Sequence, residues 1–318
     1  MSGTQPTILV AGSANLDFVV RAETIPAPGQ TVLGSDFQTF PGGKGANQAI
    51  ACARAGGAAT RMLLALGDDA HAAPLERSLH DAGVELHLHR AAAPTGVAFI
   101  CVSASGENAI TVAPGANVAL RPEHLPPLAG VTHLLLQLET PLATVMAYVR
   151  AAKSAGVTVV LNAAPARQLP QDLLEGLDIL VVNEDELALV SGSTGGVADG
   201  LARLRVPCVV VTLGARGAIA CSGGKFILQE PFAVQVVDTT AAGDTFCGTM
   251  TAALSRGEPL AAALRFASAA AALACTRAGA QTSIPERSEV DAFVLTRTDD
   301  RDAAARRQAL AAYCGLPS

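Results

Sequence analysis

The sequence predicts an α/β fold: a doubly wound, mainly parallel sheet flanked by helices, with a second, small β-sheet. Short, continuous apolar runs such as residues 7–12 (TILVAG) are typical of strands that are buried on both faces. Helical patterns alternate with such runs along most of the chain, as they do in repeated βα units. Two segments, 29–40 and 96–113, break this alternation and look like exposed strands that can pair with each other.

The expected elements follow in chain order. Strands are expected at 7–12, 61–66, 132–138, 157–161, 179–182, 208–213, 218–221, 225–228 and 232–237. Helices are expected at 46–55, 70–82, 141–155, 184–190, 196–204, 243–255 and 259–277. No linker or repeat divides the chain, so residues 1–318 are expected to form a single domain. The segment 297–318 is charged and then Ala-rich, and is expected to be a C-terminal extension with a peripheral helix.

Composition and charge narrow the class of protein. Half of the 318 residues are hydrophobic and the net charge is −6, which fits a compact enzyme and gives no support to binding of nucleic acid or membranes. The seven cysteines are scattered without a C-x-x-C pair, as free thiols are in a reducing compartment. No signal peptide and no run of about 18 strongly apolar residues is recognisable. The sequence therefore indicates a cytoplasmic protein.

Residues 237–246 (VDTTAAGDTF) have the pattern of an anion site. A strand-like segment precedes them and a long Ala-rich helical pattern follows. Small residues at a helix start leave backbone N–H groups unpaired, and these groups bind anions together with the helix dipole. Asp244 stands at this helix start, where it is either an N-cap or a carboxylate with a chemical role. This stretch alone does not decide between the two.

Further polar or Gly-rich loops follow predicted strands, at residues 13–17 (SANLD), 41–48 (PGGKGANQ), 139–141 (ETP), 183–186 (NEDE) and 212–217 (TLGARG). Each alone has an ordinary explanation as a turn or as acidic residues near a helix dipole. The acidic residues at 184–186 also suit a hydrated Mg²⁺ that accompanies a nucleotide. Because the carboxyl ends of parallel strands share one edge of a sheet, the loops together predict a ligand site. The spacing of a P-loop is absent.

These motifs occur in the order found in the ribokinase-like (PfkB) carbohydrate kinases, which the chain resembles over about residues 5–295. The resemblance implies a large α/β domain with a β-sheet lid, with lid strands from about 13–40 and 96–113. It implies a homodimer in which the lids of two subunits clasp each other. It also implies transfer of the γ-phosphoryl group of MgATP to the 5-hydroxyl of D-ribose, with K⁺ as an activating cation.

The resemblance further implies roles for individual residues. Asp244 matches the general base, and Ala241, Ala242 and Gly243 match the anion hole. The sugar-binding positions are Asn15, Asp17, Gly43, Lys44, Asn47 and Glu139. The nucleotide-contacting positions are Asn183, Thr212, Gly214, Gly217 and Ser268, where Ser268 is smaller than the His or Asn usual in the family. Glu186 matches a position tied to Mg²⁺. The K⁺ site matches Asp238, Thr240, Ala274, Arg277, Gly279 and Ser283, several of them through backbone carbonyls.

Two alternatives remain open. The chain can be a kinase for another small sugar, such as deoxyribose or fructose, although Asn15 and Glu139 favour a ribose-like ligand. It can also be a non-catalytic sugar or nucleotide sensor. That alternative needs a broken catalytic set, whereas Lys44, Gly243 and Asp244 are all present.

Overall fold

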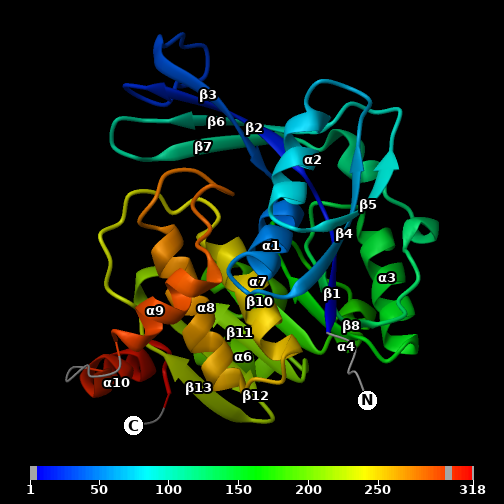
Figure 1. Cartoon of the computed structure of the whole chain (residues 1–318). Helices are drawn as coiled ribbons and strands as arrows, with labels where there is room; N and C mark the ends of the chain where they lie inside the picture. The colour runs from blue at the N-terminus through cyan, green and yellow to red at the C-terminus, as the bar shows by residue number, and fades with distance from the viewer. Residues whose placement is uncertain (1–5, 298–302, 317–318) are drawn as a thin grey trace.

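The computed structural model describes residues 6–297 and 303–316 as two sheets and the helices that cover the larger one (Figure 1). In order across it, the strands of the larger sheet are β13 (Lys225–Gln229), β12 (Ala218–Ser222), β11 (Cys208–Thr212), β10 (Ile179–Asn183), β9 (Thr158–Asn162), β8 (Val131–Leu136), β1 (Thr7–Ala11), β4 (Ala59–Leu66) and β5 (Glu85–Arg90). Neighbours from β5 to β11 are parallel, and only β12 runs in the opposite direction, so that it pairs antiparallel with both β11 and β13. The predicted doubly wound α/β fold is therefore confirmed.

Helices cover both faces of this sheet because its strands are apolar on both sides. In β1, Ile8 and Val10 belong to one core, and Leu9 and Ala11 belong to the other. The first core is covered by α1 (Lys44–Ala53), α2 (Ala72–Asp81), α7 (Ala242–Ser255), α8 (Leu260–Ala274) and α9 (Arg287–Leu295). The second is covered by α3 (Leu142–Ser154), α4 (Gln171–Glu175), α5 (Glu184–Ser191), α6 (Val197–Arg203) and α10 (Ala303–Tyr313).

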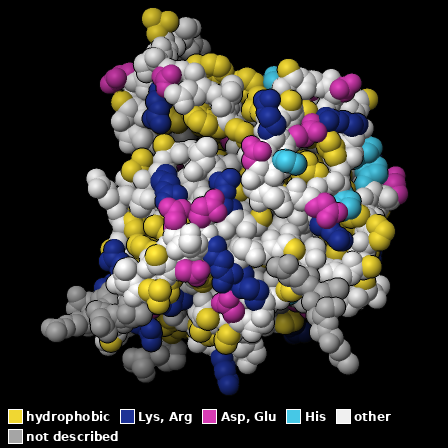
Figure 2. Space-filling model, in the orientation of Figure 1, with side chains coloured by type: hydrophobic (Ala, Val, Ile, Leu, Met, Phe, Trp, Pro, Cys, Tyr) yellow, Lys and Arg dark blue, Asp and Glu magenta, His cyan; other side chains and the backbone are white. Residues whose placement is uncertain are grey.

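The smaller sheet, called the lid sheet below, has four strands in the order β3 (Gly34–Gly42), β2 (Asn15–Ala22), β6 (Gly96–Val102) and β7 (Asn108–Ala113). Strands β3, β6 and β7 correspond to the segments 29–40 and 96–113, but β2, which falls only within the wider range 13–40 implied by the resemblance, lies between β3 and β6 and pairs with both. The Phe18 ring stacks on Phe37 and Phe99, with ring centroids 6.0 Å and 5.5 Å away. Hydrophobic side chains gather on the surface of this part of the molecule, at the top of Figure 2.

One predicted strand is wrong. Residues 232–237 form no strand, although apolar side chains dominate this segment. The segment leaves β13 at the edge of the sheet and must return to α7, which packs on α1 near the middle, so no neighbouring strand is available to it. Instead, the N–H groups of Val237 and Asp238 donate to the carbonyl of Cys275, at 2.8 Å and 3.2 Å. The anion-site pattern therefore starts from a loop and not from a strand.

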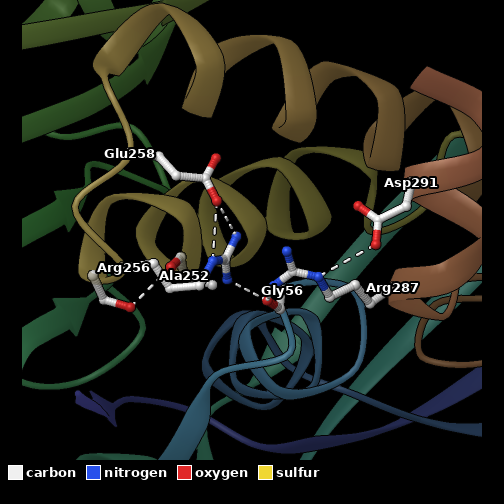
Figure 3. Close-up of polar contacts among 7 residues, drawn as sticks. Gly56, Ala252, Arg256, Glu258, Arg287 and Asp291 are labelled. Carbon is white, nitrogen blue, oxygen red and sulfur yellow. Dashed lines mark hydrogen bonds and ion pairs between the residues drawn. The ribbon is translucent and has the colours of Figure 1, made fainter. Parts of the chain in front are cut away.

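Helices α1 and α7 begin in the motifs 42–48 and 238–246, and small residues allow the two helices to pack closely. A Cβ added at Gly248 would lie 2.4 Å from the carbonyl oxygen of Gln48, and one at Gly56 would lie 2.2 Å from the Cβ of Ala252. The far ends of the two helices meet at the Gly56 carbonyl, which accepts hydrogen bonds from Arg256 (2.5 Å) and Arg287 (3.0 Å) (Figure 3). This junction fixes how the opposite ends of α1 and α7 face each other.

The C-terminal segment forms a helix as expected, and it is more firmly attached than a peripheral helix would be. In α10, Leu310 is buried within the second core, and Cys314 follows it there.

All seven cysteines are free, as predicted. Among residues 6–297 and 303–316, no helix combines the length and the apolar character that a membrane crossing requires.

Candidate active site

The carboxylate of Asp244 is held by side chains and does not cap its own helix. The N-cap of α7 is Ala241, in the left-handed conformation at φ 59°, and Asp244 stands in the first turn. Its two oxygens accept hydrogen bonds from the side-chain amides of Asn47 and Gln48, both at 2.9 Å. The structure thus excludes Asp244 as the side-chain cap of α7 and shows a buried carboxylate that is oriented by α1.

Backbone donors surround this carboxylate at the start of α7. The N–H of Ala242 donates to the carbonyl of Thr239 at 3.2 Å, and the N–H of Thr245 donates to Ala241 at 2.8 Å. Gly243 and Asp244 lie between these two residues. Their N–H groups have no acceptor among the described residues, because a helix offers none to its first turn. The predicted anion hole therefore has two free donors and the positive end of the α7 dipole.

A chain of buried amides supports the Asp244 carboxylate, and the sequence reasoning missed it. The Gln48 amide nitrogen, which donates to Asp244, also donates to Asn162 at 3.0 Å, and its oxygen accepts from Gln137 at 2.6 Å. Gln48 and Gln137 are fully buried. Their signal in the sequence is a polar residue inside an apolar pattern, as in residues 132–138 (THLLLQL).

Asn15 and Asp17 lie on β2, the lid strand that follows β1, and are buried. The Asn15 oxygen accepts a hydrogen bond from the Asn117 amide at 2.7 Å. Asp17 accepts no hydrogen bond from the described residues, and its Oδ2 would lie only 2.1 Å from a Cβ at Gly42. Burial, and then the negative charges of Glu139 and Asp244, raise the pKa of Asp17 to about 7. The site therefore holds an unsatisfied carboxyl group where a ligand's hydroxyl groups can bind.

Glu139 joins the start of α1 to the end of β1. Its Oε2 accepts hydrogen bonds from the hydroxyl of Ser13 at 2.5 Å and from the backbone N–H of Lys44 at 3.1 Å. Gly43 precedes Lys44 at φ 90°, and a Cβ there would lie 2.7 Å from the Ala14 Cα. Only glycine fits this close approach. The adjacent glycines of the 42–45 loop are therefore needed for its geometry.

The Lys44 ammonium group lies among carboxylates that belong to different loops. The negative charge of Asp244 raises its pKa, which burial alone would lower. Glu139 and Glu186 raise the pKa of Lys44 further. Hydrogen bonds show that these loops meet: Glu139, after β8, accepts from the Lys44 N–H, and Asn47 of α1 donates to Asp244 of α7. The predicted convergence is therefore confirmed for the loop after β8 and the starts of α1 and α7.

On the nucleotide side, Asn183 and Glu186 are engaged with each other at the start of α5. The Asn183 side chain accepts from the Glu186 N–H, and the Glu186 Oε2 accepts from the Asn183 N–H, both at 2.8 Å. This reciprocal capping box was not expected from the sequence, which suggested only that acidic residues suit the helix dipole. Burial raises the pKa of Glu186, and its Oε1 accepts no hydrogen bond from the described residues. One oxygen of Glu186 thus remains for a hydrated Mg²⁺.

The loop after β11 lies beside this cap. Thr212 pairs with Asn183 across the parallel strands. Gly214, at φ 56°, is the first residue of a single 3₁₀ turn, η3 (Gly214–Arg216), and Gly217, at φ 105°, follows the turn. Ser268 lies half-buried on α8, and no hydrogen bond among the described residues connects it to these loops. The structure thus places Asn183, Thr212, Gly214 and Gly217 at the ends of two neighbouring strands.

The candidate K⁺ site is centred on Asp238. One carboxylate oxygen accepts from the N–H and hydroxyl of Thr240 at 2.9 Å and 2.6 Å, and the other accepts from the Gly279 N–H at 3.0 Å. Burial raises the pKa of Asp238, but these hydrogen bonds outweigh it and leave the pKa below its usual value. An anionic carboxylate beside backbone carbonyls fits a hard monovalent cation.

The other predicted K⁺ ligands can act only through backbone oxygens or a hydroxyl. The Arg277 side chain is paired with Glu289 at 2.5 Å, so its charge is neutralised and only its carbonyl suits a cation. The Ala274 carbonyl accepts from the Arg277 N–H at 3.2 Å, and the buried Ser283 hydroxyl donates to Ala280 at 2.8 Å. Within the described part of the chain, no group of three His, Cys, Asp or Glu side chains forms a metal site.

Comparison with known proteins identifies the class. A family model described as "pfkB family carbohydrate kinase" matches residues 5–287. The chain belongs to this family and is therefore a carbohydrate kinase.

Individual relatives agree with this assignment. The chain is 39% identical to the ribokinase of Haemophilus influenzae over an alignment of 303 residues that covers 91% of this chain and 98% of the relative. It is 32% identical to the deoxyribokinase of Salmonella typhi over 90% of this chain and 98% of the relative. The structure of Arabidopsis thaliana ribokinase complexed with ribose and ATP superposes with a TM-score of 0.82 at 34% identity, covering 92% of this chain and 99% of that one.

Proposed function

We propose that this sugar kinase is an ATP-dependent ribokinase, which phosphorylates the 5-hydroxyl of D-ribose to give D-ribose 5-phosphate. The observation that carries the proposal is the placement of Asp244. It is buried beside free N–H donors at a helix start, and two amides hold both of its oxygens. A general base needs a fixed carboxylate next to the site of the reacting group, and phosphoryl transfer needs donors for the anionic oxygens.

In the proposed mechanism, Asp244 accepts the proton of the attacking hydroxyl. The N–H groups of Gly243 and Asp244, with the residues Ala241 and Ala242 that shape the turn, bind the transferred phosphoryl oxygens. The Lys44 charge adds electrostatic stabilisation as negative charge develops. A general base of this kind contributes about 10²- to 10⁴-fold to the rate.

The sugar would be bound from both the lid sheet and α1. The unsatisfied Asp17 carboxyl group would accept hydrogen bonds from hydroxyl groups of the sugar. These bonds would stabilise its negative charge against the repulsion by Glu139 and Asp244. The buried oxygen of Asn47 has no partner among the described residues, so it too can accept from a hydroxyl. Asn15, Glu139 and the backbone at Gly43 complete the proposed set. These groups select the sugar and do not react.

ATP would bind over Asn183, Thr212, Gly214 and Gly217, with Ser268 on its adenine side. Mg²⁺ bound to the phosphates would neutralise their charge, and Glu186 would reach it through Oε1. K⁺ would be held by Asp238 and Thr240 with carbonyl or hydroxyl oxygens of Ala274, Arg277, Gly279 and Ser283. A cation there adds positive charge next to the anion hole, since Asp238 and Thr240 lead directly into α7.

We further propose a homodimer through the lid sheet. The lid sheet exposes large apolar side chains on both faces: Phe37 and Phe99 lie on the face of Phe18, whereas Ile110 and Val112 lie on the face of Asp17. Exposed apolar side chains on a four-stranded sheet are typical of a protein–protein contact. Pairing two lids would remove them from water.

A panel of sugars tests the function. D-ribose, 2-deoxy-D-ribose and D-fructose are each supplied with MgATP in an assay coupled to ADP release, once with K⁺ and once with Na⁺. We expect the highest kcat/KM for D-ribose, and faster turnover with K⁺. A preference for deoxyribose, the substrate named for the Salmonella typhi relative, would move the assignment within the family. Binding of ribose without ADP release from any sugar would favour the sensor alternative.

A further inference from the structure

The helix α10 lies beyond the part of the chain that the family model matches, residues 5–287, and it ends at the predicted nucleotide loops. The hydroxyl of Tyr313, the last residue of α10, donates to the Oε1 of Glu184 at 2.5 Å. The guanidinium group of Arg216 lies 4.1 Å from the centre of the Tyr313 ring. Arg216 also pairs with the Oε2 of Glu184 at 2.7 Å. The three side chains therefore form a closed triangle.

Each corner of the triangle belongs to a different element. Glu184 is the first residue of α5, directly after Asn183, and Arg216 lies in the η3 turn between Gly214 and Gly217. The neighbours of both residues are the proposed nucleotide contacts. Tyr313 thus holds the α5 start and the η3 turn in a fixed relation from outside the family domain.

Other contacts of this segment make the position of Tyr313 well defined. The Cys314 carbonyl accepts from the N–H of Ala198 at 3.0 Å, which ties the end of α10 to α6. Leu310 and Cys314 are 4% and 1% exposed, among apolar side chains of the second core. One turn and a half earlier, Arg307 pairs with the buried Glu230 at 3.2 Å. The helix is therefore anchored on both sides of the aromatic ring.

We propose that Tyr313 is a positioning residue for nucleotide binding: it clamps the α5 start to the η3 turn and so keeps the nucleotide loops in their binding geometry. The proposal rests on the proposed function, because it takes these loops as the ATP site. Holding a loop in its bound shape lowers the entropy lost on binding, so loss of the clamp weakens ligand affinity. No hydrogen bond or ion pair among the described residues joins the triangle to the sugar side, on the lid sheet and α1, so ribose binding should not respond.

The test uses three variants of the full chain. Tyr313→Ala removes the ring and the hydroxyl, whereas Tyr313→Phe keeps the ring against Arg216 and loses only the hydrogen bond. Gln308→Ala is the control, because it changes an exposed side chain of the same helix that makes no hydrogen bond or ion pair with the described residues. For each, the Kd for ADP is measured by calorimetry, and KM for ATP, KM for ribose and kcat are measured by ADP release.

We expect Tyr313→Ala to raise the Kd for ADP and the KM for ATP by about 3- to 30-fold, because the lost cation–π contact and hydrogen bond hold the loops and not the nucleotide, so only part of their free energy reaches the affinity. KM for ribose should stay within about twofold, Tyr313→Phe should be intermediate, and Gln308→Ala should match the unaltered protein. The Tyr313 side chain is 47% exposed, so folding should survive its removal, and circular dichroism checks this.

Two results would overturn the clamp: an unchanged Kd for ADP in Tyr313→Ala, or an equal rise of both KM values, which a general loss of structure would cause. The calorimetric Kd needs no turnover, so it tests the clamp even if the unaltered chain phosphorylates no sugar. If the unaltered chain binds no ADP, the proposed nucleotide site fails, and the clamp fails with it.

Discussion

Asp17 offers a quantitative test of how the sugar side of the site is built. Its carboxyl group is 8% exposed and accepts no hydrogen bond from the described residues, and its pKa is raised from the ordinary 3.8 to about 7. Between these two values the folded protein binds more protons than the unfolded chain, so the free energy of unfolding falls as pH rises through this window. Above pH 7 the full difference of about 3 pKa units corresponds to about 4 kcal/mol.

The substitution Asp17→Asn removes the charge and keeps the shape of the side chain. We expect the apoprotein of this variant to be more stable than the unaltered protein by up to about 4 kcal/mol at pH 8, shrinking to about 1.5 kcal/mol at pH 5. Urea unfolding of both proteins at the two pH values measures this. The KM for ribose should rise about 10- to 150-fold, because a hydrogen bond to a charged group contributes about 1.5 to 3 kcal/mol.

The unaltered protein gives an independent check. If ribose binds the ionised form of Asp17, its KM should rise as pH falls below about 7, by up to about tenfold per unit. A variant that is no more stable than the unaltered protein at pH 8, or a stability difference that does not depend on pH, would refute the argument that this carboxyl group is destabilised by burial and like charge.

Three further substitutions test other parts of the account. Gln48→Leu removes the amide that donates to Asp244. We expect kcat to fall about 10- to 100-fold with KM for ATP nearly unchanged, because a hydrogen bond to a charged group is lost. An unchanged kcat would contradict the role of Gln48. Asp238→Asn lowers the charge of the candidate cation site, so the ratio of kcat in K⁺ to kcat in Na⁺ should approach one, and a retained ratio would exclude this site. Ile110→Glu places a charge on the apolar lid surface and should yield monomers in sedimentation velocity runs, whereas an unaltered dimer would locate the interface elsewhere.

The strands of the main sheet were predictable because they are buried on both faces and therefore read as continuous apolar runs. The edge strand β5 was not predicted, since its sequence ELHLHR is half-buried and carries charged and polar side chains. For residues 232–237 the error was the opposite: a strand was predicted and none formed. Their apolar side chains suggest a strand, but whether a strand forms depends on an available neighbour, which is a property of the whole topology.

The site was predictable in its loops but not in its contacts. Residues 42–48 and 238–246 could each be identified as motifs, yet the hydrogen bond from Gln48 to Asp244 joins residues 196 positions apart. Local patterns carry no information about such a pair. The same holds for Tyr313, whose partners Glu184 and Arg216 belong to loops far away in the sequence. The resemblance assigned Asp244 the role of base, but that its side chain does not cap α7 could be seen only in three dimensions.

The most direct test of the central claim, that Asp244 is the general base of a ribose kinase, is the turnover of Asp244→Asn with MgATP and D-ribose. The new side-chain amide faces Asn47, whose own amide can turn to offer its unpaired oxygen, so the fold should tolerate the change. We expect kcat to fall by about 10²- to 10⁴-fold, while calorimetry shows ribose bound with an affinity within a few-fold of the unaltered protein. Near-normal turnover in a folded Asp244→Asn protein would contradict the account.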